Sequence, residues 1–96
     1  IEGDILFFSY SGDVGLNRDM SNELMYLFPE KVISVVFIKN GKANISLRWS
    51  EGDIRKIALA AIKNIEHAVG GGHEKALGLQ MLAEDVAKFK QNLFNS

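Results

Sequence analysis

Three consecutive glycines followed by a histidine are the pattern in this 96-residue chain that most directly indicates chemistry. The run is Gly70, Gly71 and Gly72, with His73 after it and Lys75 two residues later. Glycine costs about 0.5–1 kcal/mol of stability in regular structure, so such a run indicates a sharp turn or a close approach to the backbone. Two interpretations remain open: a helix C-cap followed by a loop, or an anion site whose amides and His73 bind phosphate.

Arg48 is the second candidate for binding an anion. It stands in a segment in which apolar and polar residues alternate over residues 43–49, which predicts a strand with Arg48 on its polar face. A guanidinium group there can hold a phosphate through two parallel hydrogen bonds. The alternative is an exposed arginine on a solvated strand face, and either interpretation places Arg48 outside the core, like His73.

Several other kinds of site are disfavoured by the sequence. The chain has no cysteine, which removes thiolate chemistry and disulfides and is typical of a reducing cytoplasm. His67 and His73 are the only histidines, and Leu77 stands where a zinc-binding H-E-x-x-H motif would need its second histidine. No apolar run approaches the roughly 18 residues of a membrane span, and no signal peptide is visible. We therefore predict a cytoplasmic protein without a membrane association.

The charge is distributed unevenly along a chain whose net charge is only −1. Residues 1–30 carry six acidic side chains against one basic one, whereas residues 31–96 carry ten basic against six acidic ones. The basic excess in the second half favours an anionic ligand there, although scattered solvated charges would produce the same count. Hydrophobic residues make up 47% of the chain, which is ordinary for a globular domain and argues against intrinsic disorder.

The first half of the sequence predicts the elements that must position these candidates. Residues 4–10 indicate a buried strand ended by a turn at residues 11–13, and residues 20–28 indicate a helix stopped by Pro29. The β-branched run at residues 32–38 is typical of a central strand covered on both faces. Asn40-Gly41 then predicts a type I′ hairpin leading into the alternating strand described above.

The second half predicts a further helix, a short strand and a last helix. Ser50 is the expected N-cap, with Asp53 completing a variant of the capping box, and an apolar stripe extends the helix over residues 54–65. After the glycines we expect one helical turn at residues 74–77, a strand at residues 79–81 and a helix at residues 83–94. The order β-α-β-β-α-β-α predicts an α/β (α+β) class with a mixed sheet and helices packed on it. The length fits one domain, residues 1–96.

Two segments resemble the DHH-associated C-terminal domain. The sequence VGGGHEKALG, residues 69–78, is similar to the family's glycine-glycine-glycine-histidine motif and to the basic residue, small residues and glycine that follow it. The sequence ISLRWS, residues 45–50, is similar to a family strand that ends in Ser-Leu-Arg-Ser. The order of elements matches over nearly the whole chain. Leu77 and Trp49 depart from the pattern, and we expect Trp49 in the core, with base stacking as the alternative.

The resemblance implies the substrate-binding, C-terminal part of a manganese-dependent phosphoesterase acting on single-stranded DNA, RNA or short oligonucleotides. Its manganese and catalytic residues would belong to an N-terminal DHH domain, so we expect no cofactor, no metal ligand and no hydrolase activity in this chain alone. The candidate substrate-binding residues are Arg48, Gly70, Gly71, Gly72, His73 and Lys75. The alternatives are a non-catalytic tRNA-binding module related to the C-terminal domain of alanyl-tRNA synthetases, and a structural or dimerising domain.

Overall fold

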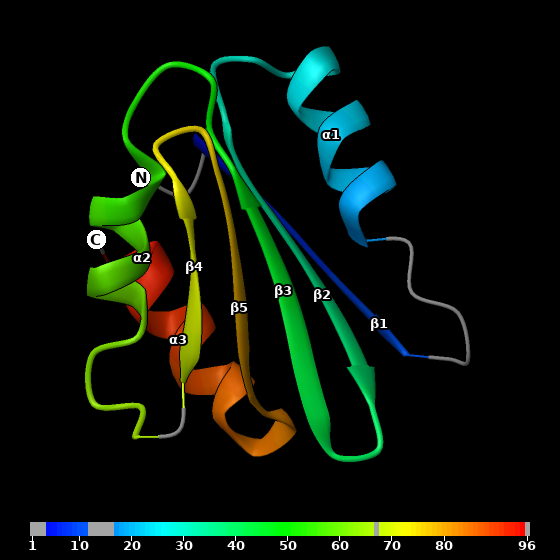
Figure 1. Cartoon of the computed structure of the whole chain (residues 1–96), viewed down its shortest axis with the longest axis vertical. Coiled ribbons are helices and arrows are strands. Elements are labelled where there is room, and N and C mark those ends of the chain that lie inside the picture. Colours follow the sequence, from blue (N-terminus) through cyan, green and yellow to red (C-terminus); the bar gives the residue numbers. More distant parts are fainter. Residues whose placement is uncertain (1–3, 12–16, 67, 96) are drawn as a thin grey trace.

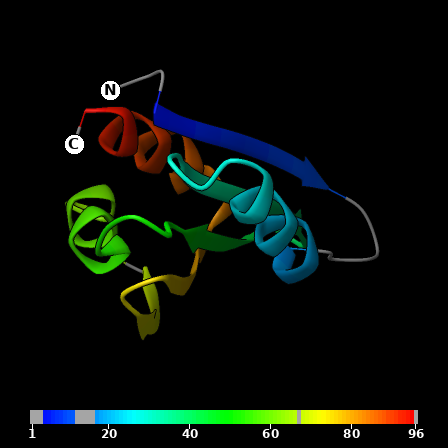
Figure 2. The same ribbon diagram turned by 90° about the horizontal axis from the view of Figure 1, so that it is seen from above.

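Five strands form one mixed sheet, with helices on both of its faces (Figures 1 and 2). The structure, a computed structural model, describes residues 4–11, 17–66 and 68–95. The strands, in chain order, are β1 (Ile5–Ser11), β2 (Val32–Lys39), β3 (Lys42–Arg48), β4 (Val69–His73) and β5 (Ala76–Leu82). Their order across the sheet is β1-β2-β3-β5-β4, in which β1 and β2 are parallel and the other neighbours are antiparallel. The predicted fold class and mixed sheet are confirmed.

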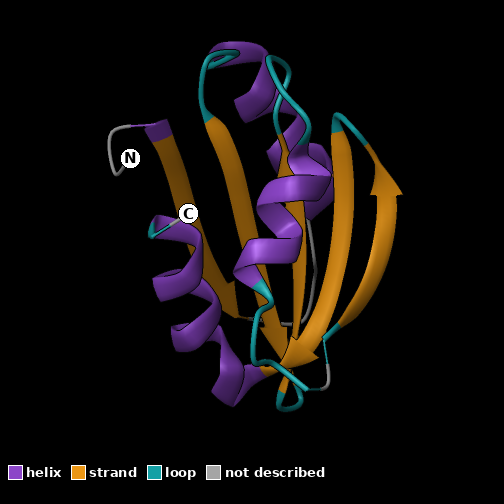
Figure 3. Ribbon diagram, turned by 90° about the vertical axis from the view of Figure 1, so that its left-hand side faces the viewer, coloured by secondary structure: helices purple, strands orange, loops and turns teal. Residues whose placement is uncertain are grey.

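The helices divide between the two faces of this sheet. Helix α1 (Asn17–Leu27) connects β1 to β2 and packs mainly over β2 and β3. Helices α2 (Ile54–Ala61) and α3 (Val86–Phe94) pack against each other on the opposite face, as Figure 3 shows. A 3₁₀ turn, Ala83–Asp85, leads into α3. No helix in the described part of the chain is both long and apolar enough to cross a membrane.

The main core lies between the sheet and the α2–α3 layer. The fully buried side chains of this layer come from β2, β3 and both helices, and they include Val36, Leu47, Ile54, Phe89 and Leu93. The predicted stripe of α3 is confirmed at Phe89 and Leu93. Burying such a side chain contributes about 1.5–3 kcal/mol relative to leaving it exposed, so this layer holds α2 and α3 on the sheet.

The first three strands follow the sequence prediction, with one correction. Strand β2 is central and buried, and Asn40 (φ 54°) and Gly41 (φ 76°) have the positive φ angles of the predicted type I′ turn. Strand β1, predicted as buried, is instead an edge strand in which Ile5 is buried and Phe8 is 42% exposed. An edge strand has a neighbour on one side only, which explains this exposure. Gly12 and Asp13 of the predicted turn lie outside the described residues.

The N-cap of α2 is Asp53, and the prediction of Ser50 is wrong. The Asp53 carboxylate accepts a hydrogen bond from the Arg55 backbone N–H (3.0 Å) and forms an ion pair with the Arg55 guanidinium (2.9 Å). The hydrogen bond from the Arg55 side chain is the largest influence that lowers the pKa of Asp53 to about 2. The Ser50 hydroxyl donates to the carbonyl oxygen of Pro29 (2.6 Å) and so joins two loops. The helix also ends earlier than predicted, at Ala61.

The glycine run is a strand, which corrects both the predicted C-cap and the predicted helical turn at residues 74–77. Strand β4 contains all three glycines, and Glu74 and Lys75 form the turn into β5. Strand β5 is the predicted strand at residues 79–81, extended in both directions. Its buried residues Leu77, Leu79 and Met81 alternate with exposed ones, and this two-residue period is incompatible with a helical turn at Leu77.

Candidate functional site

The strand register brings three of the predicted residues to one face of the sheet. Arg48 on β3 is paired with Ala76 on β5, and Ala76 is paired with His73 on β4. Two residues further along, Ser46, Gly78 and Gly71 form a second row across the same strands. Directly paired residues project to the same side of a sheet. This is the side that carries α1, and because α1 packs mainly over β2 and β3, no helix of the described residues covers this face of β5 and β4.

A hollow of about 330 Å³ lies over these two rows. Its lining consists of Ser46, Arg48, Gly71, His73, Ala76, Leu77 and Gly78. The floor is formed by glycine and alanine, so a ligand there meets backbone and methyl groups rather than long side chains. Of the predicted site residues, Arg48, Gly71 and His73 therefore come together, and Gly70, Gly72 and Lys75 do not line the hollow.

Arg48 is buried, with 9% of its surface exposed, so the expectation that it lies outside the core is wrong. Its Nε donates to Oδ1 of Asn22 on α1 (2.9 Å), and its Nη1 donates to the carbonyl oxygens of Leu47 (2.9 Å) and Leu77 (3.5 Å). The cause is α1, which covers this end of β3 and supplies the acceptor. A guanidinium stays protonated in proteins. The hollow thus has a permanent positive charge in its wall, held in one orientation.

Asn22 is the residue of this site that the sequence analysis did not identify. Its amide oxygen links α1 to the guanidinium of Arg48, at a sequence separation of 26 residues. The sequence gives only a general indication, which is that an arginine on a strand needs hydrogen-bond acceptors. Helix α1 contains several polar side chains, and no spacing distinguishes Asn22 from the others.

His73 and Lys75 have different positions around the β4–β5 turn. His73 is exposed at the end of β4 and lines the hollow, where its ring can exchange hydrogen bonds with a ligand. Lys75 Nζ donates to the carbonyl oxygen of Ser50 (2.7 Å), and the Lys75 carbonyl accepts from the backbone N–H of Trp49 (3.1 Å). Lys75 therefore holds the β4–β5 turn against the segment that follows Arg48. This contact fixes the distance between the Arg48 side and the His73 side of the hollow.

Two of the three glycines have no room for a side chain, and the third has room for one. A Cβ at Gly70 would overlap the carbonyl oxygen of Gly78, and a Cβ at Gly72 would overlap that of Ala76. A Cβ at Gly71 would meet no atom within 4 Å. None of the three has a positive φ. Gly70 and Gly72 are thus required by close packing against β5, and Gly71 alone leaves space on the open face.

The comparisons with known proteins agree with this architecture. The family model of the DHHA1 domain matches residues 6–95. The C-Ala domain of Aquifex aeolicus alanyl-tRNA synthetase is similar in structure, with a TM-score of 0.74 and 14% identity over 95% of this chain and 85% of that chain. RecJ from Thermus thermophilus, solved in complex with Mg²⁺, has a TM-score of 0.69 and 16% identity. That match covers 97% of this chain and 14% of RecJ. No curated protein matches in sequence.

Proposed function

The chain belongs to the DHHA1 domain family, and on that premise we propose that it binds the phosphate and sugar of a single-stranded or short nucleic acid over the Arg48–His73 hollow. The observation that carries this proposal is the convergence of Arg48 from β3 with Gly71 and His73 from β4 on one open hollow. The sequence motif alone supplies two of these residues in one segment. The sheet adds the third, Arg48, from an earlier strand of the chain.

The arrangement supports binding by a preformed site. The Arg48 guanidinium is already held by Asn22 and two carbonyl oxygens, so little side-chain freedom is lost when a phosphate binds to it. Charge-assisted hydrogen bonds to an ionised phosphate are about twice as strong as neutral ones. The open space at Gly71 lets the sugar-phosphate backbone approach the sheet, and His73 contacts it from the exposed end of β4.

We assign the hydrolytic step to a DHH catalytic domain N-terminal to this chain, in a cytoplasmic DHH-family phosphoesterase. The RecJ likeness supports this assignment, because the chain corresponds to 14% of that protein. Among the described residues no three His, Cys, Asp or Glu side chains gather in a group that could hold a metal ion. The described residues therefore do not fit manganese.

Binding of a 5′-phosphorylated four-nucleotide DNA or RNA strand to the purified chain tests this function. We expect a saturable rise in fluorescence anisotropy of a 3′-labelled strand, because the strand binds to a fixed cation. For one or two phosphate contacts, the affinity should fall roughly three- to sevenfold between 50 and 200 mM salt. Affinity that does not change with salt, or the absence of binding by both strands, would contradict the proposal.

A second candidate function is a non-catalytic tRNA-binding module. The structural likeness to the C-Ala domain of an alanyl-tRNA synthetase, which covers most of both chains, favours this candidate. Competition separates the two functions. If a folded tRNA displaces the four-nucleotide strand at a concentration far below that of unlabelled strand, the tRNA-binding module is the better description. Equal or weaker displacement favours the short-strand site.

A further inference from the structure

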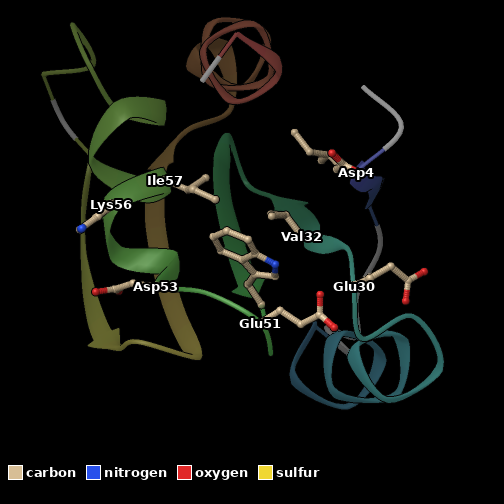
Figure 4. Close-up of a pocket in the computed structure, with 9 residues that line it drawn as sticks. Asp4, Glu30, Val32, Glu51, Asp53, Lys56 and Ile57 are labelled. Carbon is tan, nitrogen blue, oxygen red and sulfur yellow. The ribbon is translucent and has the colours of Figure 1, made fainter. Parts of the chain in front are cut away.

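A second and larger cavity, of about 730 Å³, lies at the end of the sheet where β1 and β2 begin and β3 ends (Figure 4). It is lined by four apolar side chains, Ile5, Val32, Trp49 and Ile57, and by the charged residues Asp4, Glu30, Glu51, Asp53 and Lys56. Its volume is within the range of about 300–1,000 Å³ that is common for small-molecule sites. Arg48 and Trp49 are consecutive and face opposite sides of the sheet, so this cavity is separate from the hollow.

The charges around this cavity are predominantly negative. Asp53 is occupied by its ion pair with Arg55. Within the described residues, Asp4, Glu30 and Glu51 take part in no ion pair. Figure 4 shows that Lys56 and Asp53 extend from α2 away from Glu30 and Glu51. Three acidic residues that form no ion pair within the described part of the chain therefore border a cavity whose inner wall is apolar.

Trp49 provides an aromatic wall in a fixed position. It is partly buried and packs against the main core, as predicted for Trp49 from the sequence. Gly52 lies directly against its six-membered ring, since a Cβ at Gly52 would fall 2.7 Å from Cε3. The ring position thus depends on the absence of a side chain at Gly52. Its indole N–H is buried and has no hydrogen-bond partner in the described part of the chain.

We propose that this cavity binds an organic cation: a guanidinium or alkylammonium group on an apolar stem. Carboxylates attract the cation, the Trp49 ring stabilises it by a cation–π contact, and the stem packs on Ile57 and Val32. A phosphate-bearing ligand would be repelled by the carboxylates. A hard metal ion needs about six oxygen ligands in one group, and the described residues contain no cluster of even three suitable side chains. An organic cation is larger than a metal ion, so it can contact carboxylates that lie too far apart to bind one metal ion together.

The test uses the intrinsic fluorescence of Trp49, which is the only tryptophan of the chain. The probe is n-butylguanidinium, and its matched control is n-butylurea, which has nearly the same shape without the charge. We expect a saturable change in emission with n-butylguanidinium at an affinity at least tenfold higher than with n-butylurea. Each titration is repeated at two salt concentrations, because the charged contact weakens with ionic strength and an apolar one does not.

Two variants locate the effect. In Glu30→Gln/Glu51→Gln we expect the affinity for n-butylguanidinium to fall at least threefold, because two of the attracting charges are removed. Glu84→Gln removes a carboxylate outside this cavity and should bind the probe like the wild type. None of the three altered side chains is buried, so the fold should be retained, and a thermal melt of each variant verifies this.

The source of the cation is distinguished by a further probe, N-acetylarginine methylamide, which presents an arginine side chain between peptide groups. Binding as tight as that of n-butylguanidinium assigns the cavity to an arginine of a protein partner, and much weaker binding assigns it to a free small cation. The proposal is overturned if n-butylurea binds as tightly as n-butylguanidinium, if the response does not saturate, or if the double variant binds the charged probe like the wild type.

Discussion

Replacing Gly72 by alanine will lower the free energy of unfolding by about 1–3 kcal/mol or more, the range for forcing an extra carbon into a packed site. The added Cβ would overlap the Ala76 carbonyl oxygen and stand 2.7 Å from Cα of Leu77. Both atoms belong to the β5 backbone, which cannot give way like a flexible side chain. For a domain of this length, 1 kcal/mol corresponds to a fall of about 4–8 °C in Tm. Urea unfolding of the purified variant measures the effect.

Gly71→Ala is the matched control, one residue away in the same strand. Its Cβ meets no atom within 4 Å, so the unfolding free energy should stay within about 0.5 kcal/mol of the wild type or rise slightly. Its methyl group enters the hollow, however, and should weaken binding of the four-nucleotide strand severalfold. Equal stability losses in both variants would contradict the distinction between the two glycines.

Replacing Arg48 by glutamine should have the largest effect on binding. Loss of a charge-assisted contact costs about 1.5–3 kcal/mol, which corresponds to a roughly 10- to 150-fold lower affinity for the phosphorylated strand. The variant should also be less stable, because Arg48 is buried and Asn22 and the Leu77 carbonyl lose their donor. Affinity by anisotropy and stability by urea unfolding are measured on the same preparation.

Two control variants separate charge from geometry at Arg48. Arg48→Lys keeps the charge but lacks the planar fork that donates to Asn22 and to the carbonyl oxygens, so its affinity should be intermediate. Lys88→Gln removes one exposed positive charge on α3, on the other face of the sheet, and should bind almost normally. Wild-type affinity in Arg48→Gln would mean that this guanidinium is only structural.

Much of the fold could be predicted from the sequence because its signals are local. The Asn40-Gly41 turn requires positive φ at two adjacent residues, and few sequences other than Asn-Gly satisfy this requirement so readily. Strand β2 and helix α3 have side-chain patterns that identify them without knowledge of their neighbours. The order of all elements except β4 follows from such local patterns.

The glycine strand and the burial of Arg48 could not be predicted in this way. Glycines have no side chains, so Gly70–Gly72 carry no periodicity that distinguishes a strand from a loop. Their strand structure comes from pairing with β5, which is a tertiary effect. The alternation correctly predicts that Arg48 lies on the polar face of its strand, but α1 covers that face at Arg48. Alternation indicates the side of a sheet on which a residue lies and does not indicate which helix covers it.

The most direct test of the central claim, that nucleic acid binds over the Arg48–His73 hollow, is a map of chemical-shift changes on the ¹⁵N-labelled chain during titration with the 5′-phosphorylated four-nucleotide strand. We predict that the largest changes occur at the backbone amides of Gly71, His73 and Gly78 and at the Arg48 Nε–H group, all of which lie at this hollow. The Trp49 indole N–H, on the other side of the sheet, should change little. Shifts that are confined to other surfaces, while Gly71, His73 and Arg48 stay unchanged, would contradict the account.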